Sequence, residues 1–376
     1  MRILIAPDSF KGSLTSVEVA QALAAGWRRV RPDDDIALAP LADGGEGTLA
    51  TVQAAGGWHR RTARARDPLG RWIDAPWLCS TDGANAVVEL AAASGLSRLR
   101  PDELDPEGAL TCGTGDLLRA ALDAGVRHVV MGIGGSATTD GGRGILEALG
   151  ATVRWPDEAG APTIDLQRLD PRLGRVAFEV ACDVTNPLLG ARGAAATYGP
   201  QKGASAAQVR TLDARNASWA DGLEAATGRA ARELPGAGAA GGVGFALLCL
   251  AGRFAGFALR PGIDLVMETV GFHERLIGSD LVITGEGRID AQTAFGKTAL
   301  GVARRAQAAG VRCIAVGGGI EPAGVEALAA VGAQVVPVWE QAVPVAQAMA
   351  AGAAPLVECG ARMAAMSQPN RPAATS

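Results

Sequence analysis

The chain contains 376 residues, which corresponds to about two or three domains of average size. Hydrophobic residues make up 48% of the chain and charged residues 20%, so it can build a sizeable core and carries too little charge to be disordered. The formal net charge of −4 argues against nucleic acid or an anionic membrane surface as the main partner.

Short β-rich apolar runs alternate with Ala- and Leu-rich helical stretches, a pattern typical of an α/β fold with a largely parallel sheet. Thr15 and Glu18 form a capping box that predicts the start of the first helix, and a second helix is expected over residues 298–309. The predicted strands, in chain order, are Arg2–Ala6, Ile36–Leu41, Ala86–Glu89, His128–Ile133, Val176–Cys182, Leu281–Thr284, Arg312–Val316 and Gln334–Val338.

The clearest strand–helix units lie at the two ends of the chain, whereas the middle is richer in glycine, proline and polar loops. We therefore expect one α/β domain built from residues 1–60 and 275–376, with a second α/β domain, residues 61–274, inserted into it. Ligands of such sheets bind outside the carboxyl ends of the strands, so we expect the active site in the cleft between the two domains.

Lysine is unusually scarce in this sequence. Of 35 basic residues only Lys11, Lys202 and Lys297 are lysines, and each adjoins a glycine. A compact ammonium beside a glycine loop is a common way to hold a phosphate, whereas arginine presents a wider planar fork. We interpret the three lysines as phosphate-facing; the alternative is that their placement is accidental.

Six polar, glycine-bearing segments carry the functional signal, and most of them follow a predicted strand directly. The first, residues 6–13, places Asp8, Ser9 and Lys11 before the capped helix. Free N–H groups and the helix dipole favour anions at such a position. The segment therefore predicts an anion-binding loop.

The second segment, residues 41–48, contains the run Asp43-Gly44-Gly45-Glu46. Two carboxylates in a glycine loop repel one another and have no apolar cover. They suit Mg²⁺ coordination or acceptance of a proton from a substrate hydroxyl. The alternative is that they simply cap the next helix.

The third segment, residues 132–142, combines five glycines, three hydroxyl groups and one carboxylate, a composition that suits a phosphate cradle. Its Gly132-x-Gly134-x-x-Ala137 spacing also matches a dinucleotide fingerprint, but no strand with an acidic end follows at the required distance. We therefore favour the cradle, with its candidate ligand contacts at Gly134, Gly135, Ser136, Thr138 and Asp140.

The fourth and fifth segments lie in the middle of the chain. In residues 182–190, Asp183 and Asn186 form a carboxylate–amide pair that suits metal or hydroxyl binding, although both are also ordinary turn formers before Pro187. Residues 198–203 contain Lys202 and the one tyrosine of the sequence, Tyr198.

The sixth segment, residues 284–298, contains Glu286, Arg288 and Asp290 and then the run Gly296-Lys297-Thr298. That run is the tail of a P-loop, but Ala291 stands where the Walker A pattern requires glycine. No Walker A motif is present, so we expect phosphate and Mg²⁺ to be handled by a different geometry.

Lysines, carboxylates and glycine loops, without cysteine or histidine chemistry, describe phosphoryl transfer. Together the segments resemble the bacterial type-I glycerate kinases, and the resemblance extends over the whole length of the chain. It rests on the following strings, in this order: APDSFKGSL, PLADGGEGT, GIGGSATTDGG, CDVTNPLLG, YGPQKG, PGIDLVM and TGEGRIDAQTAFGKT.

The resemblance implies two α/β domains, one of them flavodoxin-like, and an ATP-dependent kinase that uses Mg²⁺ to phosphorylate D-glycerate, giving 2-phosphoglycerate. On this basis Lys11, Lys202 and Lys297 are expected to bind phosphate oxygens or the glycerate carboxylate, and Arg288 to neutralise the transferring group. The expected metal ligands, one of which also supplies the base, are Asp43, Glu46, Asp183 and Glu286.

Three other functions are compatible with parts of the pattern: a nicotinamide dehydrogenase of hydroxy acids, a metabolite sensor that has lost its chemistry, and a kinase of another small hydroxy acid. The dehydrogenase lacks a placed histidine, and the sensor should have lost an acid or a lysine that this chain retains. The sequence does not decide which carboxylate is the base.

The expected compartment follows from the cysteines and the N-terminus. The six cysteines are dispersed and form no C-x-x-C pair, as is usual for buried thiols of a reducing cytosol. The apolar run at residues 3–6 stops at Pro7 and is too short for a signal peptide. We therefore expect a cytoplasmic protein. The resemblance implies glycerate and ATP, rather than a membrane, as its partners, and we expect a monomer or homodimer.

Overall fold

The computed structural model describes residues 1–156, 160–293, 298–341 and 343–367. It is an α/β protein, as predicted, and its residues group into two compact units. Unit 1 comprises residues 1–43, 50–56 and those from 266 onward, and unit 2 comprises residues 44–49 and 57–265. That the two units act as separate domains with a site between them stays a prediction.

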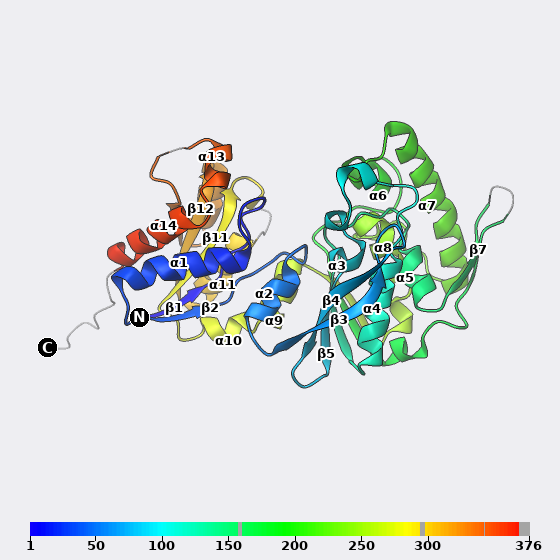
Figure 1. Ribbon diagram of the computed structural model, residues 1–376, viewed down its shortest axis with the longest axis horizontal. Helices are drawn as coiled ribbons and strands as arrows, with labels where there is room; N and C mark the ends of the chain where they lie inside the picture. The colour runs from blue at the N-terminus through cyan, green and yellow to red at the C-terminus, as the bar shows by residue number, and fades with distance from the viewer. Residues whose placement is uncertain (157–159, 294–297, 342, 368–376) are drawn as a thin grey trace. The chain divides into compact units, whose positions relative to one another are not determined.

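Unit 1 is built on a five-stranded sheet in which every neighbouring pair is parallel (Figure 1). The strand order, β13-β12-β11-β1-β2, is that of a flavodoxin-like fold. Such sheets bind ligands where the strand order reverses, which here is between β1 and β11. The strands are β1 (Arg2–Ile5), β2 (Asp35–Leu38), β11 (Leu281–Ile289), β12 (Arg312–Ile320) and β13 (Ala333–Pro337).

Helices α1 and α14 lie side by side over one face of this sheet (Figure 1). The predicted capping box starts α1, since Glu18 accepts the Thr15 N–H at 2.8 Å and the Thr15 hydroxyl accepts the Glu18 N–H. Connections between parallel strands are right-handed, which assigns α11 and α12 to the opposite face. The helices are α1 (Ser16–Val30), α10 (Phe272–Leu276), α11 (Thr298–Ala309), α12 (Pro322–Ala329), α13 (Val345–Ala350) and α14 (Ala354–Met366).

One hydrophobic core of unit 1 lies between the sheet and helices α1 and α14. Ile3 and Ile283 of the strands, Trp27 of α1 and Met363 of α14 are all buried in one hydrophobic cluster. Glycines allow the helices to approach closely: a Cβ on Gly26 would lie 1.8 Å from the carbonyl oxygen of Val357. The position of α14 therefore depends on the absence of a side chain at residue 26.

Unit 2 contains a six-stranded mixed sheet of order β10-β9-β6-β5-β4-β3, in which the first four strands are parallel and the last two antiparallel. A two-stranded ribbon, β7 (Thr152–Arg154) with β8 (Thr163–Asp165), lies apart from this sheet. The sheet strands are β3 (Trp58–Arg66), β4 (Trp72–Ser80), β5 (Asn85–Glu89), β6 (His128–Gly132), β9 (Ala177–Ala181) and β10 (Gly256–Arg260).

The helices of unit 2 are α3 (Ala91–Ser94), α4 (Cys112–Asp123), α5 (Arg143–Ala148), α6 (Ala194–Tyr198), α7 (Ala206–Thr227) and α8 (Ala239–Cys249). Two further helices, α2 (Thr48–Ala54) and α9 (Gly262–Thr269), contain residues of both units.

All eight predicted strands are confirmed, most of them to within one or two residues at each end. The helix predicted over residues 298–309 is α11. The antiparallel pair β3 and β4 was not predicted, because β3 is an arginine-rich edge strand whose side chains are mostly exposed, so it shows no apolar alternation.

We predict that Gly26→Ala destabilises the protein. Helix propensity alone would make alanine at residue 26 more favourable by about 1 kcal/mol. Overpacking of a tight contact typically costs about 1–3 kcal/mol, and here the opposing atoms are backbone. The Tm of Gly26→Ala should therefore fall, whereas Gln21→Ala on the exposed face of α1 should change it little. A higher Tm for Gly26→Ala would contradict the packing described for α1 and α14.

Candidate active site

Unit 1 contains a cavity of about 570 Å³ at the carboxyl edge of its parallel sheet. The cavity is lined by the loop after β1, by the last residues of β11 and β12, and by residues that follow β13. It thus lies beside the point where the strand order reverses, where ligands of this fold class bind. Of the residues proposed from sequence, the cavity brings together Asp8, Ser9, Lys11, Asp43, Glu286, Arg288 and Asp290.

The loop after β1 contains a half-buried carboxylate, Asp8, and an exposed cation, Lys11. Asp8 accepts hydrogen bonds from the Ser9 N–H and from the Thr298 hydroxyl, both at 2.6 Å. Burial raises the pKa of Asp8, and the charge of Asp43 raises it further. The ammonium of Lys11 is 80% exposed and lies 3.8 Å from the Asp43 carboxylate. The Lys11 side chain is therefore accessible to an anionic ligand.

The end of β11 contributes one buried acid and one exposed cation. Glu286 is 6% exposed and accepts a hydrogen bond of 2.5 Å from the Thr293 hydroxyl. Arg288 is exposed, donates a hydrogen bond to Glu321 and lies 3.6 Å from the Asp290 carboxylate. Its guanidinium is held at the cavity by carboxylates rather than by packing.

Among the residues that the structure describes, acids outnumber cations around this cavity. A cavity of this composition repels a polyphosphate or a carboxylate unless positive charge accompanies the ligand. Lys297, predicted to bind phosphate, lies outside the described residues. The charged groups of known placement that line the cavity are the acids Asp8, Asp43, Glu286, Asp290 and Glu321 and the cations Lys11 and Arg288.

In unit 2, glycines let the loop after β6 pack against the run that follows Asp43. A Cβ on Gly132 would lie 2.4 Å from the carbonyl oxygen of Gly44, and one on Gly134 would lie 2.7 Å from the Cα of Gly45. Gly44 and Gly135 also adopt left-handed backbone conformations. These glycines therefore allow two backbone segments to touch at the carboxyl edge of the second sheet.

Lys202 is buried beneath this glycine loop and is only 1% exposed. Its ammonium donates to the Ser136 hydroxyl at 2.8 Å and to the carbonyl oxygen of Thr138 at 2.6 Å. Burial lowers the pKa of Lys202 to about 7, and the charge of Asp140 opposes that shift. In this structure the lysine holds the loop from within.

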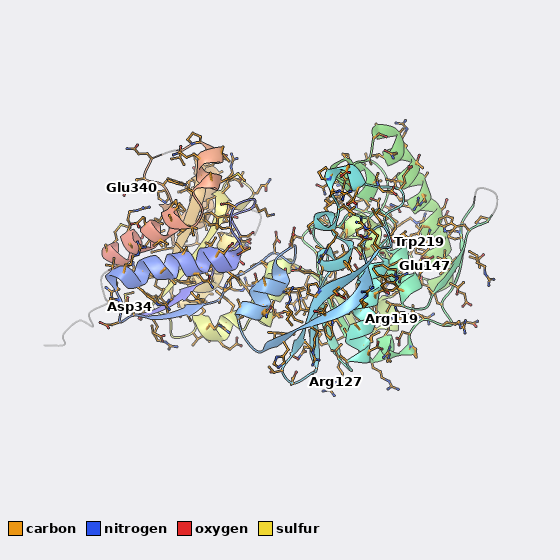
Figure 2. All side chains as sticks on the ribbon, in the orientation of Figure 1. Asp34, Arg119, Arg127, Glu147, Trp219 and Glu340 are labelled. Atoms are coloured by element: carbon orange, nitrogen blue, oxygen red, sulfur yellow. The ribbon has the colours of Figure 1, made fainter. Side chains whose placement is uncertain are left out.

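Asp140 is also buried and ties the loop to its surroundings. Its carboxylate accepts the N–H and hydroxyl of Thr111 at 2.9 and 2.7 Å, and the N–H groups of Gly142 and Gly144 at 3.1 and 3.0 Å. Trp219 of α7, labelled in Figure 2, donates its indole N–H to the carbonyl oxygen of Gly141. Residues 132–142 are therefore anchored at both ends.

The remaining predicted residues of unit 2 have defined local partners. Asp183 accepts the Gly262 N–H at 2.9 Å. Asn186 accepts the Tyr198 hydroxyl at 2.8 Å and donates to the carbonyl oxygen of Arg192. Glu46 is exposed. These partners of Asp183 and Asn186 lie 79, 6 and 12 residues away along the chain, so the contacts join separate segments rather than forming a turn before Pro187.

Glu89 is a buried acid that is not among the site residues predicted from the sequence. It ends β5, is 7% exposed, and accepts the Leu49 N–H at 2.7 Å. Burial raises the pKa of Glu89 to about 7, and the charge of Glu46 adds to this effect. A carboxylate directly after an apolar strand was a usable signal, because loops at the carboxyl ends of parallel strands carry the chemistry of α/β folds.

No cluster of three or more metal-ligating side chains occurs among the residues that the structure describes. The four predicted metal ligands divide between the units, with Asp43 and Glu286 in unit 1 and Glu46 and Asp183 in unit 2. Mg²⁺ that arrives on a nucleotide commonly takes only one or two carboxylates from the protein. Asp8 and Asp43, whose charges interact, fit that requirement.

A family model described as the glycerate kinase family matches residues 3–368. The chain belongs to the glycerate kinase family. It is 44% identical over 330 residues to a glycerate kinase of Halalkalibacterium halodurans, with 85% of each chain covered. It is also 44% identical over 317 residues to the glycerate 2-kinase of Escherichia coli strain K12, with 82% of each chain covered.

The same family appears in the structural comparison. A crystal structure from Salmonella typhimurium LT2, named as a candidate glycerate kinase 2, matches with a TM-score of 0.83 and 40% identity. The match covers 97% of this chain and 98% of that chain. The chain is thus an enzyme of the glycerate kinase type, and a kinase family implies ATP as the phosphate donor.

Among the described residues of this glycerate kinase family member, none of the helices has the length and hydrophobicity needed to cross a bilayer.

We predict that Glu89 makes stability depend on pH. The unfolded carboxyl group ionises near its ordinary pKa of 4.5, and the folded one near 7. Between these values the folded state holds the extra proton, so stability falls as pH rises. Across this window the Tm of the wild type should fall relative to that of Glu89→Gln, which keeps an oxygen acceptor for Leu49. Parallel Tm curves would show that Glu89 is not the titrating group.

Proposed function

We propose that the chain is an ATP-dependent kinase that phosphorylates D-glycerate at the 2-hydroxyl group, giving 2-phosphoglycerate with the assistance of Mg²⁺. The observation that carries this proposal is the unit 1 cavity, where exposed cations and a surplus of carboxylates lie at the strand ends of a glycerate kinase family member. Phosphoryl transfer requires positioning and charge neutralisation, which such a set of groups can supply.

The position of the phosphate is supported by the relative from Escherichia coli, whose name is glycerate 2-kinase. The three-carbon acid presents two hydroxyl groups, and transfer to either one releases ADP. ADP release therefore tests the kinase activity but not which hydroxyl group is phosphorylated.

The surplus of acids supports a role for a divalent cation. Bound Mg²⁺ would neutralise phosphate oxygens and thereby ease attack at the terminal phosphorus. Asp43, together with Asp8 or Glu286, is suited to hold it, because these carboxylates share the cavity. Glu46 and Asp183, which lie in unit 2, can take part in holding the same Mg²⁺ only if the two units close on one ligand.

The cations have the complementary task. We assign phosphate oxygens to Lys11 and Lys297, and charge neutralisation of the transferring group to Arg288. As the oxygen–phosphorus bond to glycerate forms and the bond to ADP breaks, the hydroxyl proton passes to a carboxylate. Asp43, Glu46, Asp183 and Glu286 stay the candidates for this base.

The glycine loop of unit 2 would supply backbone N–H groups to the phosphates or to glycerate, through Gly134 and Gly135. Lys202 and Asp140 support this role indirectly, because their buried contacts hold residues 132–142 in one conformation. This part of the proposal also includes the domain division. One domain comprises residues 1–60 and 275–376, the other comprises residues 61–274, and the loops of both are proposed to meet in one cleft.

The product test is direct. Purified protein with D-glycerate and Mg-ATP should release ADP in a coupled assay, and phosphorus NMR should identify 2-phosphoglycerate. A phosphate on the other hydroxyl group would overturn only the regiochemistry. No ADP release with D-glycerate or any other small hydroxy acid would overturn the kinase.

We predict that Lys11→Met lowers kcat/KM by about a hundredfold or more, the usual cost of removing one group that stabilises developing charge. Its fold should persist, because the side chain is 80% exposed. Arg29→Met is the matched control: Arg29 is also an exposed cation of unit 1 in an ion pair, with Glu358, but it lies on α1 away from the cavity. Equal activity of the two variants would remove Lys11 from the proposed site.

A further inference from the structure

Part of the lining of the unit 1 cavity is apolar, which glycerate and phosphate leave unexplained. It is lined by Val338 and Trp339, which follow β13, and by Val345 and Met349 of α13. Val345 is 72% and Met349 45% exposed, so α13 presents apolar groups to solvent beside the charged groups described above. Exposed apolar side chains that gather at a cavity commonly mark a binding surface.

The size of the cavity argues for a ligand larger than glycerate. Its volume, about 570 Å³, is within the range of pockets that enclose drug-sized molecules. Glycerate is a short acid with a hydroxyl group on each non-carboxyl carbon, so it has no apolar surface to cover Trp339 or Met349. ATP has a charged end and a flat aromatic end, which suits a cavity lined by both charged and apolar side chains.

Trp339 is the side chain best suited to contact a base. It is half-buried and packs against the hydrophobic core of unit 1 while also lining the cavity. An indole held in this way loses little conformational freedom when a ligand covers its remaining surface. Stacking on such a ring suits any flat base.

The end of β12 leaves backbone accessible beside this surface. The pairing of β12 with β13 ends at Gly317 and Pro337, yet β12 continues to Ile320. A Cβ on Gly318 would lie 2.7 Å from the carbonyl oxygen of Gly287, so packing requires that glycine. At Gly319 a Cβ would meet only the Cγ of Arg288, at 3.6 Å, so packing does not require glycine there. Its missing side chain keeps the cavity open.

From this juxtaposition we propose that the apolar lining of the unit 1 cavity, formed by Trp339, Val345 and Met349, binds the base and ribose of ATP. The triphosphate then extends toward Lys11 and Arg288, and glycerate binds elsewhere. This inference rests on the proposed function, because it assumes that ATP is the donor.

Photolabelling tests the inference without requiring turnover. An azido-ATP probe with Mg²⁺ should label residues at or next to Trp339, Val345 or Met349 in the full-length protein, and excess ATP should prevent the labelling. Labelling confined to unit 2, or insensitive to ATP, would overturn it. The result is independent of whether D-glycerate is phosphorylated, so failure of this inference can be distinguished from failure of the proposed function.

Kinetics provide a second test. Trp339→Leu should raise the KM for ATP about tenfold or more, the usual effect of losing one base–aromatic stack, with the KM for D-glycerate unchanged. Val345→Asn should raise the KM for ATP in the same direction, and its exposure means that folding does not depend on it. The matched control is Ile277→Asn, which changes an exposed apolar residue of unit 1 outside the cavity. A raised KM for D-glycerate with an unchanged KM for ATP would overturn the assignment.

Discussion

Crowding of carboxyl groups at one edge of the unit 1 sheet is the constraint on which the proposed chemistry depends. Parallel strands place every loop that follows a strand on the same edge, so acids far apart in the sequence are forced together. Asp8 shows the consequence, since burial and the nearby Asp43 both raise its pKa. The arrangement is unfavourable on its own, and a bound cation would offset the repulsion.

The glycine loop of unit 2 represents a different solution to positioning. Here the backbone itself is held in place, because Gly132 and Gly134 allow it to touch the segment that contains Gly44 and Gly45. The buried side chains of Lys202 and Asp140 donate or accept hydrogen bonds that fix the loop. A loop fixed in this way would present its backbone N–H groups without reorganising, which is the property that electrostatic stabilisation of a transition state requires.

The sequence was a good guide to the fold and a partial guide to the site. Apolar strands such as Val176–Cys182 and the capping box at Thr15 are local patterns, and the structure confirms both. Lys202 shows the limit: the scarcity of lysine and the adjoining glycine suggested a phosphate-facing side chain, whereas the hydrogen-bond partners that bury it lie more than sixty residues away in the chain. Burial that arises from such distant contacts leaves no local mark. Glu89 did carry a local signal, since it ends an apolar strand, but its burial and its contact with Leu49 could not be predicted from neighbouring residues.

Calorimetric titration of ATP, with Mg²⁺ and with a chelator, tests the central electrostatic claim most directly. If carboxylates crowd the phosphate site, the wild type should bind ATP much more tightly with Mg²⁺. A double variant, Asp8→Asn with Asp43→Asn, should lose most of that difference because it binds metal-free ATP better. Equal affinity of the wild type with and without Mg²⁺, or an unchanged difference in the double variant, would contradict the account.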